Sequence, residues 1–173
     1  MAYTPWVTIF LIPFIFLRYA SADLVSNVCI QTRNNALCSQ TLYNSSEYSN
    51  YTDAKGLAYI MIGAALDRAA HNLVYVKELI DNQNSTNPND PNQCLQNCYK
   101  DYSLLVKAII PDANQSLSAG TTFVAAVAIL YSADKILDCQ DEDCVKISSN
   151  LNDKCNEYAD FAQVVVDVLR VTP

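Results

Sequence analysis

Apolar residues recur at every third or fourth position along most of the chain, the spacing that gathers them on one face of an α-helix. The first long segment with this pattern takes Thr52 or Asp53 as its N-cap and ends in the polar residues 81–84. The second begins near Pro91, a residue suited to the first turn of a helix, and stops at Pro111. The pattern therefore predicts two long helices joined by a polar loop.

Two further segments continue the pattern, after a polar turn at 112–118. The third helix is expected from about Ser118 to Asp141, and its alanines allow close approach to a neighbouring helix. Its large apolar residues are expected to form the core stripe; these are Phe123, Val124, Val127, Leu130, Tyr131 and Leu137. The fourth helix begins near Leu151. Four amphipathic helices with short connections predict an all-α, up-down-up-down four-helix bundle over residues 52–173.

A shorter amphipathic segment precedes the bundle. Apolar residues on either side of a polar turn at 32–35 predict a small helical hairpin, clipped by a disulfide between Cys29 and Cys38. Closing such a short loop contributes about 2–3 kcal/mol to the free energy of unfolding in the chain-entropy model. A polar linker leads on to the first long helix, so hairpin and linker together occupy residues 23–51.

The N-terminus indicates the cellular compartment. An apolar run from Trp6 to Leu17 precedes Ala20-Ser21-Ala22, the small-residue pattern of a signal-peptide cleavage site. The run is short for a bilayer span, so residues 1–22 are predicted to be a signal peptide and residues 23–173 a single secreted domain, with no membrane partner.

A secreted chain meets the N-glycosylation machinery, and this sequence contains four Asn-x-Ser/Thr sequons, the acceptor sites of that modification. They fall in segments expected to be loops or helix ends, and their asparagines are Asn44, Asn50, Asn84 and Asn114. The sequence therefore predicts a glycoprotein.

The composition further restricts the fold class and the kind of partner. The chain has only three glycines, fewer than a fold of tightly turned strands usually needs. Its formal net charge is −7, and removal of the signal peptide takes away Arg18 and makes it −8. An acidic surface argues against nucleic acid as a partner; it suits a basic protein partner or solubility alone.

Four of the seven cysteines form two pairs of similar spacing. Cys94 and Cys98 lie one helical turn apart, and Cys139 and Cys144 slightly more than one turn apart. On two antiparallel helices that pack closely, Cys98 can face Cys139 while Cys94 faces Cys144. The spacing therefore allows a disulfide ladder of two rungs.

Catalytic chemistry has few residues to draw on. His71 is the only histidine, lies within the first long helix and has no cysteine or serine motif around it. The acidic cluster of residues 138–143 lacks the central glycine and spaced glutamate of a calcium loop. The cysteine pairs lack the histidine of a zinc half-site and belong to an oxidising compartment. No catalytic residue, metal or cofactor is therefore predicted.

Several stretches together resemble the plant invertase and pectin methylesterase inhibitors. They are Cys29-x-x-Thr32 with Cys38, then Gly56-Leu57-Ala58-Tyr59-Ile60-Met61-Ile62, then Cys98-x-x-x-Tyr102, then Cys139 with Cys144. The resemblance covers essentially the whole mature chain. It implies a four-helix bundle behind a helical hairpin, and a protein that blocks an acid invertase or a pectin methylesterase of the plant cell wall or vacuole. Some members are pollen allergens.

The resemblance also implies disulfides Cys29–Cys38 and Cys98–Cys139, so Cys94, Cys144 and Cys155 are additional to the usual set. From geometry we pair Cys94 with Cys144, which leaves Cys155 as a free, partly buried thiol. The alternative is a bond between Cys144 and Cys155.

The choice of target depends on a short motif. Invertase inhibitors of this family carry Pro-Lys-Phe near the start of the third bundle helix, whereas residues 116–123 read Ser-Leu-Ser-Ala-Gly-Thr-Thr-Phe. This departure and the acidic charge favour a basic pectin methylesterase, in a 1:1 complex, over an invertase. By resemblance the second and third bundle helices provide the contact face, and the expected contact residues are Asn97, Lys100, Asp101, Thr121, Thr122, Ser132 and Lys135.

Two other classes of function compete with inhibition. A carrier of a small apolar ligand would need an unfilled cavity inside the bundle, lined by Phe123, Val127, Phe161 and Val165. An enzyme would have to work with His71 alone.

Overall fold

The computed structural model describes residues 24–82, 92–140 and 142–173. The expected signal peptide, residues 1–22, and the sequon asparagine Asn84 lie outside the described residues. Within the described ranges the secondary structure is helical and includes no strand. The all-α prediction is therefore confirmed.

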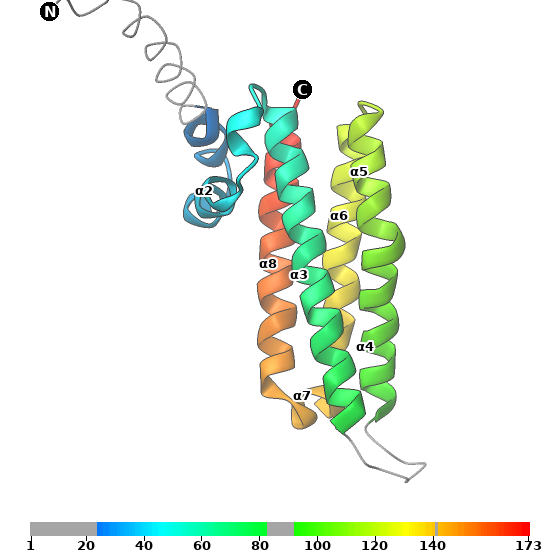
Figure 1. The fold of residues 1–173 in the computed structure, drawn as a ribbon. Helices are drawn as coiled ribbons and strands as arrows, with labels where there is room; N and C mark the ends of the chain where they lie inside the picture. Colours follow the sequence, from blue (N-terminus) through cyan, green and yellow to red (C-terminus); the bar gives the residue numbers. More distant parts are fainter. Residues whose placement is uncertain (1–23, 83–91, 141) are drawn as a thin grey trace, which may run out of the picture.

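Antiparallel helical rods form the bundle (Figure 1). They are α3 (Ala54–Asn82), then α4 (Asn92–Leu104) continued by α5 (Ile110–Ser118), then α6 (Thr122–Leu137), and finally α8 (Ser149–Arg170). Each rod contacts the next, and α8 returns to pack against α3. This is the up-down-up-down arrangement that the sequence predicts.

The first bundle helix begins where its cap requires. The Asp53 carboxylate accepts a hydrogen bond from the Gly56 amide at 2.8 Å, as an N-cap residue does. Gly56 is buried against the ring of Tyr51, and a Cβ atom at this position would overlap that ring. The close approach of Tyr51 therefore requires glycine here.

The second rod is longer than predicted, because Pro111 does not end it. A π-helical turn, η2 (Leu105–Ile109), precedes α5, and the Ile110 amide donates to the Leu105 carbonyl five residues earlier. Proline lacks an amide hydrogen and crowds the carbonyl four residues before it, so it usually interrupts a helix. The wider π-helical turn places Pro111 in the first turn of α5, where the missing hydrogen and the crowding are tolerated. Residues 112–118, predicted to be a polar turn, are therefore helical.

Gly120 makes the turn between the second and third rods. It has a φ angle of 78°, the left-handed conformation that glycine adopts most easily. The Thr121 amide reaches back to the Ser116 carbonyl at 2.9 Å, which satisfies the end of α5. The third helix then begins at Thr122, four residues later than predicted.

The buried face of α6 is not the expected one. Three of the residues that point into the bundle are small, namely Ala125, Ser132 and Ala133. Ile129 and Ile136 complete the buried side. The large residues Phe123, Val124, Val127, Tyr131 and Leu137 are exposed. Small side chains let α6 approach α8 closely, and α8 supplies the bulk with Tyr158, Phe161 and Val165.

The third rod also ends earlier than residue 141. It stops at Leu137 and is followed by a 3₁₀ turn, η3 (Asp138–Gln140), and a short helix, α7 (Glu142–Ile147). The Ser148 hydroxyl then accepts from the Leu151 amide at 3.2 Å and caps α8.

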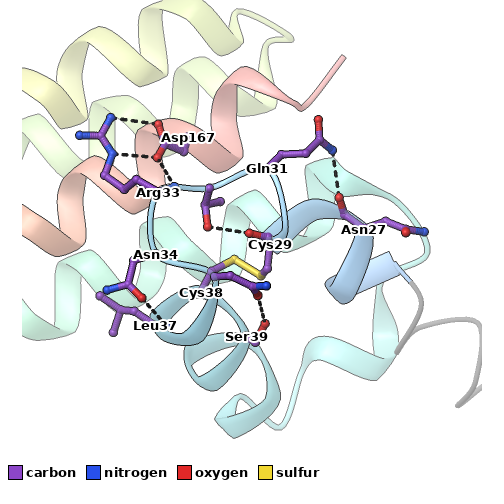
Figure 2. Close-up of a disulfide and its surroundings, with 11 residues drawn as sticks. Asn27, Cys29, Gln31, Arg33, Asn34, Leu37, Cys38, Ser39 and Asp167 are labelled. Carbon is purple, nitrogen blue, oxygen red and sulfur yellow. Dashed lines mark hydrogen bonds and ion pairs between the residues drawn. A yellow bond between two sulfur atoms is a disulfide. The ribbon is translucent and has the colours of Figure 1, made fainter.

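The N-terminal hairpin lies against α3 and α8 at the end of the bundle that holds the C-terminus (Figure 1). It consists of a helical segment at 24–29 and α2 (Asn35–Asn44), followed by the 3₁₀ turn η1 (Tyr48–Asn50). Figure 2 shows the disulfide between Cys29 and Cys38 and the Asn34 side chain that caps α2. The hairpin packs against α8 as well as α3, and the consecutive valines 164–166 of α8 are all buried.

Candidate functional site

The candidate site is the outer face of the second and third rods, where the resemblance places the contact with a target. The structure separates the expected contact residues into two groups. Asn97, Lys100, Asp101 and Lys135 lie toward the end of the bundle where α4 begins and α6 ends. Thr121 and Thr122 lie at the start of α6, about 20 Å away at 1.5 Å of rise per residue.

The first group contains a charged cluster. The Lys135 ammonium lies 4.0 Å from the Asp101 carboxylate on α4 and 3.0 Å from the Asp138 carboxylate. The hydrogen bond from Lys135 to Asp138 and the nearby charge of Asp101 raise the pKa of Lys135. Burial raises the pKa of Asp101 despite the attraction of Lys135, so the Asp101 carboxylate takes up a proton more easily than a fully solvated aspartate does. Asn97 and Lys100 are exposed beside it.

Ser132, expected as a contact residue, is fully buried, so that expectation is wrong. Its hydroxyl donates to the Ile129 carbonyl at 2.6 Å and lies 2.8 Å from the Tyr158 hydroxyl of α8. Burial, opposed by the bond to Ser132, raises the pKa of Tyr158 to about 12. The pair satisfies two polar groups inside the bundle, so Ser132 is a packing residue that no partner can touch.

The outward side of α6 carries an apolar face that the sequence reasoning assigned to the core. We call the exposed residues Phe123, Val124, Val127 and Tyr131 the α6 apolar face; Phe123 is 79 % exposed and Tyr131 is 47 % exposed. The sequence does carry a sign of this face, because α6 has apolar residues on more than one side. A surface helix usually has a polar outer side, so the extra apolar residues indicate an exposed apolar surface.

A hollow of about 320 Å³ adjoins the α6 apolar face, between α6 and the end of α8. Its residues include Phe123, Val127, Val166 and Leu169. The cavity expected for a carrier is not formed, because Phe123 and Val127 point outward while Phe161 and Val165 are packed in the core. The structure therefore offers an open apolar surface on this side of the bundle, rather than the internal chamber proposed for a carrier.

The five cysteines outside the hairpin form a second cluster, where α4, η3, α7 and α8 meet. Cys94 of α4 is bonded to Cys144 of α7, as the geometric argument predicted. Cys98, Cys139 and Cys155 are buried thiols. The Cys98–Cys139 bond implied by the resemblance is not formed, whereas the expected free thiol at Cys155 is present.

The early end of α6 gives the physical reason for this difference. Cys144 is carried on the separate helix α7, so it lies against both cysteines of α4, with its sulfur 3.8 Å from the Cys98 sulfur. Cys139 shares hydrogen bonds with Cys155 as well as with Cys98, and these contacts together with burial raise the pKa of Cys139. The regular two-rung ladder requires α6 to continue as one helix past Cys139, which it does not.

The single histidine and the possible metal ligands were the remaining candidates for chemistry. His71 is exposed on α3, beside Arg68 and Glu157. Across residues 24–82, 92–140 and 142–173 we find no group of three or more histidine, cysteine or acidic side chains arranged to hold a metal ion. Nor does any helix in these ranges combine the length and apolar character needed to cross a bilayer.

Comparison with known proteins gives two kinds of match. Residues 23–160 match the family model described as plant invertase/pectin methylesterase inhibitor. The fold is similar to a mutant form of a pectin methylesterase inhibitor from Arabidopsis, with a TM-score of 0.65 and 16 % identity over 86 % of this chain and 97 % of that one. A pectin methylesterase inhibitor from Arabidopsis thaliana gives a TM-score of 0.60 and 16 % identity, over 86 % and 95 % of the two chains. No curated protein sequence matches the chain.

Proposed function

Since this chain belongs to the plant invertase/pectin methylesterase inhibitor family, we propose that it is a secreted protein that inhibits a pectin methylesterase of the plant cell wall. The inhibitor forms a 1:1 complex through the outer face of the second and third rods and catalyses no reaction itself. Asn97, Lys100, Thr121 and Thr122 contribute polar contacts.

The α6 apolar face is the observation that carries this proposal. Large exposed side chains that cluster on one helix mark protein interaction surfaces more often than scattered ones do. Tyrosine is enriched among the residues that dominate binding energy, and Tyr131 is exposed at the middle of α6. The helix is held by the bundle on its other side, so little conformational entropy is lost when a partner covers it.

The target is inferred from charge and from the start of α6. The sequence after removal of the signal peptide carries a net charge of −8, which favours association with a basic enzyme surface. The segment that leads into α6 is Ala119-Gly120-Thr121-Thr122, without the basic residue that the invertase inhibitors carry there. Both features support a pectin methylesterase over an invertase.

The test is parallel inhibition of a plant pectin methylesterase and a plant acid invertase by the purified, secreted chain at the mildly acidic pH of the cell wall. Inhibition of the esterase alone is expected. Inhibition of the invertase alone would show that the missing basic motif is dispensable and would overturn the choice of target. A folded helical chain that inhibits neither enzyme would overturn the proposed function.

A further inference from the structure

A groove crosses α3 on the side of the bundle next to the hairpin. One hollow of about 600 Å³ lies between α2 and α3, and a second of about 400 Å³ lies between α3 and the start of α5. Glu47, Tyr59 and Gly63 line both hollows, so the two meet over the first turns of α3. We call this surface the Gly63 groove. It exists at this depth because Gly63 has no side chain, and a Cβ atom there would meet nothing within 4 Å.

The lining combines aromatic rings with hydrogen-bonding groups. The larger hollow carries the polar side chains of Gln40, Thr41, Asp67 and Arg68, and Tyr59 stands between it and the smaller one. The smaller hollow adds Tyr51, Ile62, Leu66 and Pro111. A sugar ring presents apolar C–H groups on its flat sides and hydroxyls around its edge, so it needs this mixture of flat apolar and polar partners.

Two sequon asparagines border the Gly63 groove. Asn44, at the end of α2, lines the larger hollow, and Asn114, in α5, lines the smaller one. Both residues are exposed, so a glycan attached to either side-chain nitrogen starts at the groove itself. Asn50 is also exposed but lines neither hollow, which makes it a control within the same chain.

The charges of the groove select against acidic sugars. Glu47 and Asp67 are acidic, and Arg68 is the one base among the lining residues of the two hollows. The Arg68 guanidinium lies 4.1 Å from the centroid of the Phe161 ring, which holds it against α8. A polygalacturonate segment would therefore meet a surface of like charge, whereas a neutral sugar would not.

From this arrangement we propose that the Gly63 groove seats the inner N-acetylglucosamine residues of the chain's own N-glycans, attached at Asn44 or Asn114. A tethered sugar has a high effective concentration, so shallow contacts suffice to hold it. The seated glycan ties the hairpin, α3 and α5 together and stabilises the fold. This role is independent of the inhibitory face on α6.

The first experiment compares the full chain from a eukaryotic secretory host with the same chain from a bacterial periplasm, which adds no N-glycan. Peptide mass spectrometry identifies the modified asparagines, and thermal unfolding gives Tm for each form. Wild type, G63A and G63F are measured in both hosts. G63A controls for the higher helix propensity of any residue that replaces glycine, while G63F fills the groove.

The glycosylated form of wild type and of G63A is expected to unfold about 2–4 °C above the unmodified form, the size of shift that a modest interaction gives in a chain of this length. In G63F this difference is expected to fall by at least half. N50Q is expected to leave the difference unchanged. The proposal is overturned if neither Asn44 nor Asn114 carries a glycan, if glycosylation does not change Tm, or if G63F and G63A show equal differences.

A second experiment distinguishes a tethered sugar from a free one. The unmodified chain is titrated with N,N′-diacetylchitobiose and with trigalacturonate, and the amide chemical shifts of Tyr59 and Gly63 are followed. Shifts at millimolar chitobiose that are absent in the glycosylated chain support the proposal, because the attached glycan already occupies the groove. Tighter binding of trigalacturonate, or equal response of both forms to chitobiose, would contradict it.

Discussion

The backbone amide and the guanidinium of Arg33 enclose the carboxylate of Asp167 (Figure 2). Asp167 Oδ2 accepts from the Arg33 amide at 3.0 Å and from Nε at 2.8 Å, and Oδ1 accepts from a terminal guanidinium nitrogen at 3.1 Å. Asp167 is only 8 % exposed, and 134 residues of chain separate the two partners. This charged pair fastens the hairpin turn to α8.

Removing either partner should loosen the hairpin, by unequal amounts. Arg33→Ala removes both guanidinium hydrogen bonds and leaves the nearly buried carboxylate with the backbone amide of residue 33 and the Arg170 guanidinium at 3.7 Å, so we expect a loss of about 2–3 kcal/mol in the free energy of unfolding. Asp167→Asn leaves a half-exposed arginine that water can solvate, and we expect about 1–2 kcal/mol. Urea unfolding measures both, with Lys77→Ala, at an exposed basic residue near the end of α3, as the control. A larger loss for Asp167→Asn than for Arg33→Ala would contradict this account.

The same pair makes stability depend on pH. Burial acts to raise the pKa of Asp167, but the hydrogen bonds and charge of Arg33 outweigh it and hold the pKa below its ordinary value. A depressed carboxyl pKa contributes stability that is complete above the unfolded pKa of about 3.9 and is lost as the pH falls through the folded pKa. We therefore expect wild type to lose more stability than Asp167→Asn between about pH 5 and pH 2. This range begins above the unfolded carboxyl pKa of about 3.9 and extends below it, toward the lowered folded pKa. Parallel curves for the two proteins would show that the pair does not titrate with unfolding.

Ser132→Ala should weaken the core without touching the target. The substitution leaves the buried Tyr158 hydroxyl without its partner at 2.8 Å, and we expect a loss of about 1–3 kcal/mol. The exposed neighbour Tyr131→Ala provides the comparison and should change the free energy of unfolding by less than about 0.5 kcal/mol. If inhibition falls for Ser132→Ala at a temperature where the chain remains folded, the buried role of Ser132 is wrong.

Thiol counting separates the observed cysteine arrangement from the one implied by the resemblance. Alkylation of the unfolded, unreduced chain should add three groups, at Cys98, Cys139 and Cys155. A chain with the Cys98–Cys139 bond would take only one. In the native chain we expect slow labelling, because all three sulfurs are buried. Cys155→Ala serves as the control and should lower the count by one.

Substitutions on the α6 apolar face should weaken inhibition while leaving the fold intact. We expect Phe123→Ser and Tyr131→Ser each to raise the inhibition constant for pectin methylesterase about tenfold, which corresponds to about 1.4 kcal/mol of binding energy. Val74→Ser on α3 is the matched control, since Val74 is an exposed apolar residue on a different rod and should change inhibition less than about twofold. Equal effects of all three would mean that the α6 apolar face is not the contact surface.

Much of the fold follows from local patterns in the sequence. The spacing of apolar residues predicts four bundle helices, Asp53 caps the first of them, and Cys29 and Cys38 bound a turn short enough to be closed by one disulfide. These features depend on neighbours within a few positions along the chain, so the sequence alone determines them.

Tertiary packing decided the rest. The third helix is apolar on several sides, so its pattern could not determine which side is buried; α8 already supplies bulky residues, and only the small side of α6 allows close packing against them. That rotation placed Ser132 inside and Tyr131 outside. The early end of α6 likewise moved Cys144 onto α7 and left Cys98 and Cys139 unpaired with each other. The sequence by itself therefore determined the helices and their order, whereas the face that each helix turns to its neighbours depends on the fit between side chains far apart in the chain.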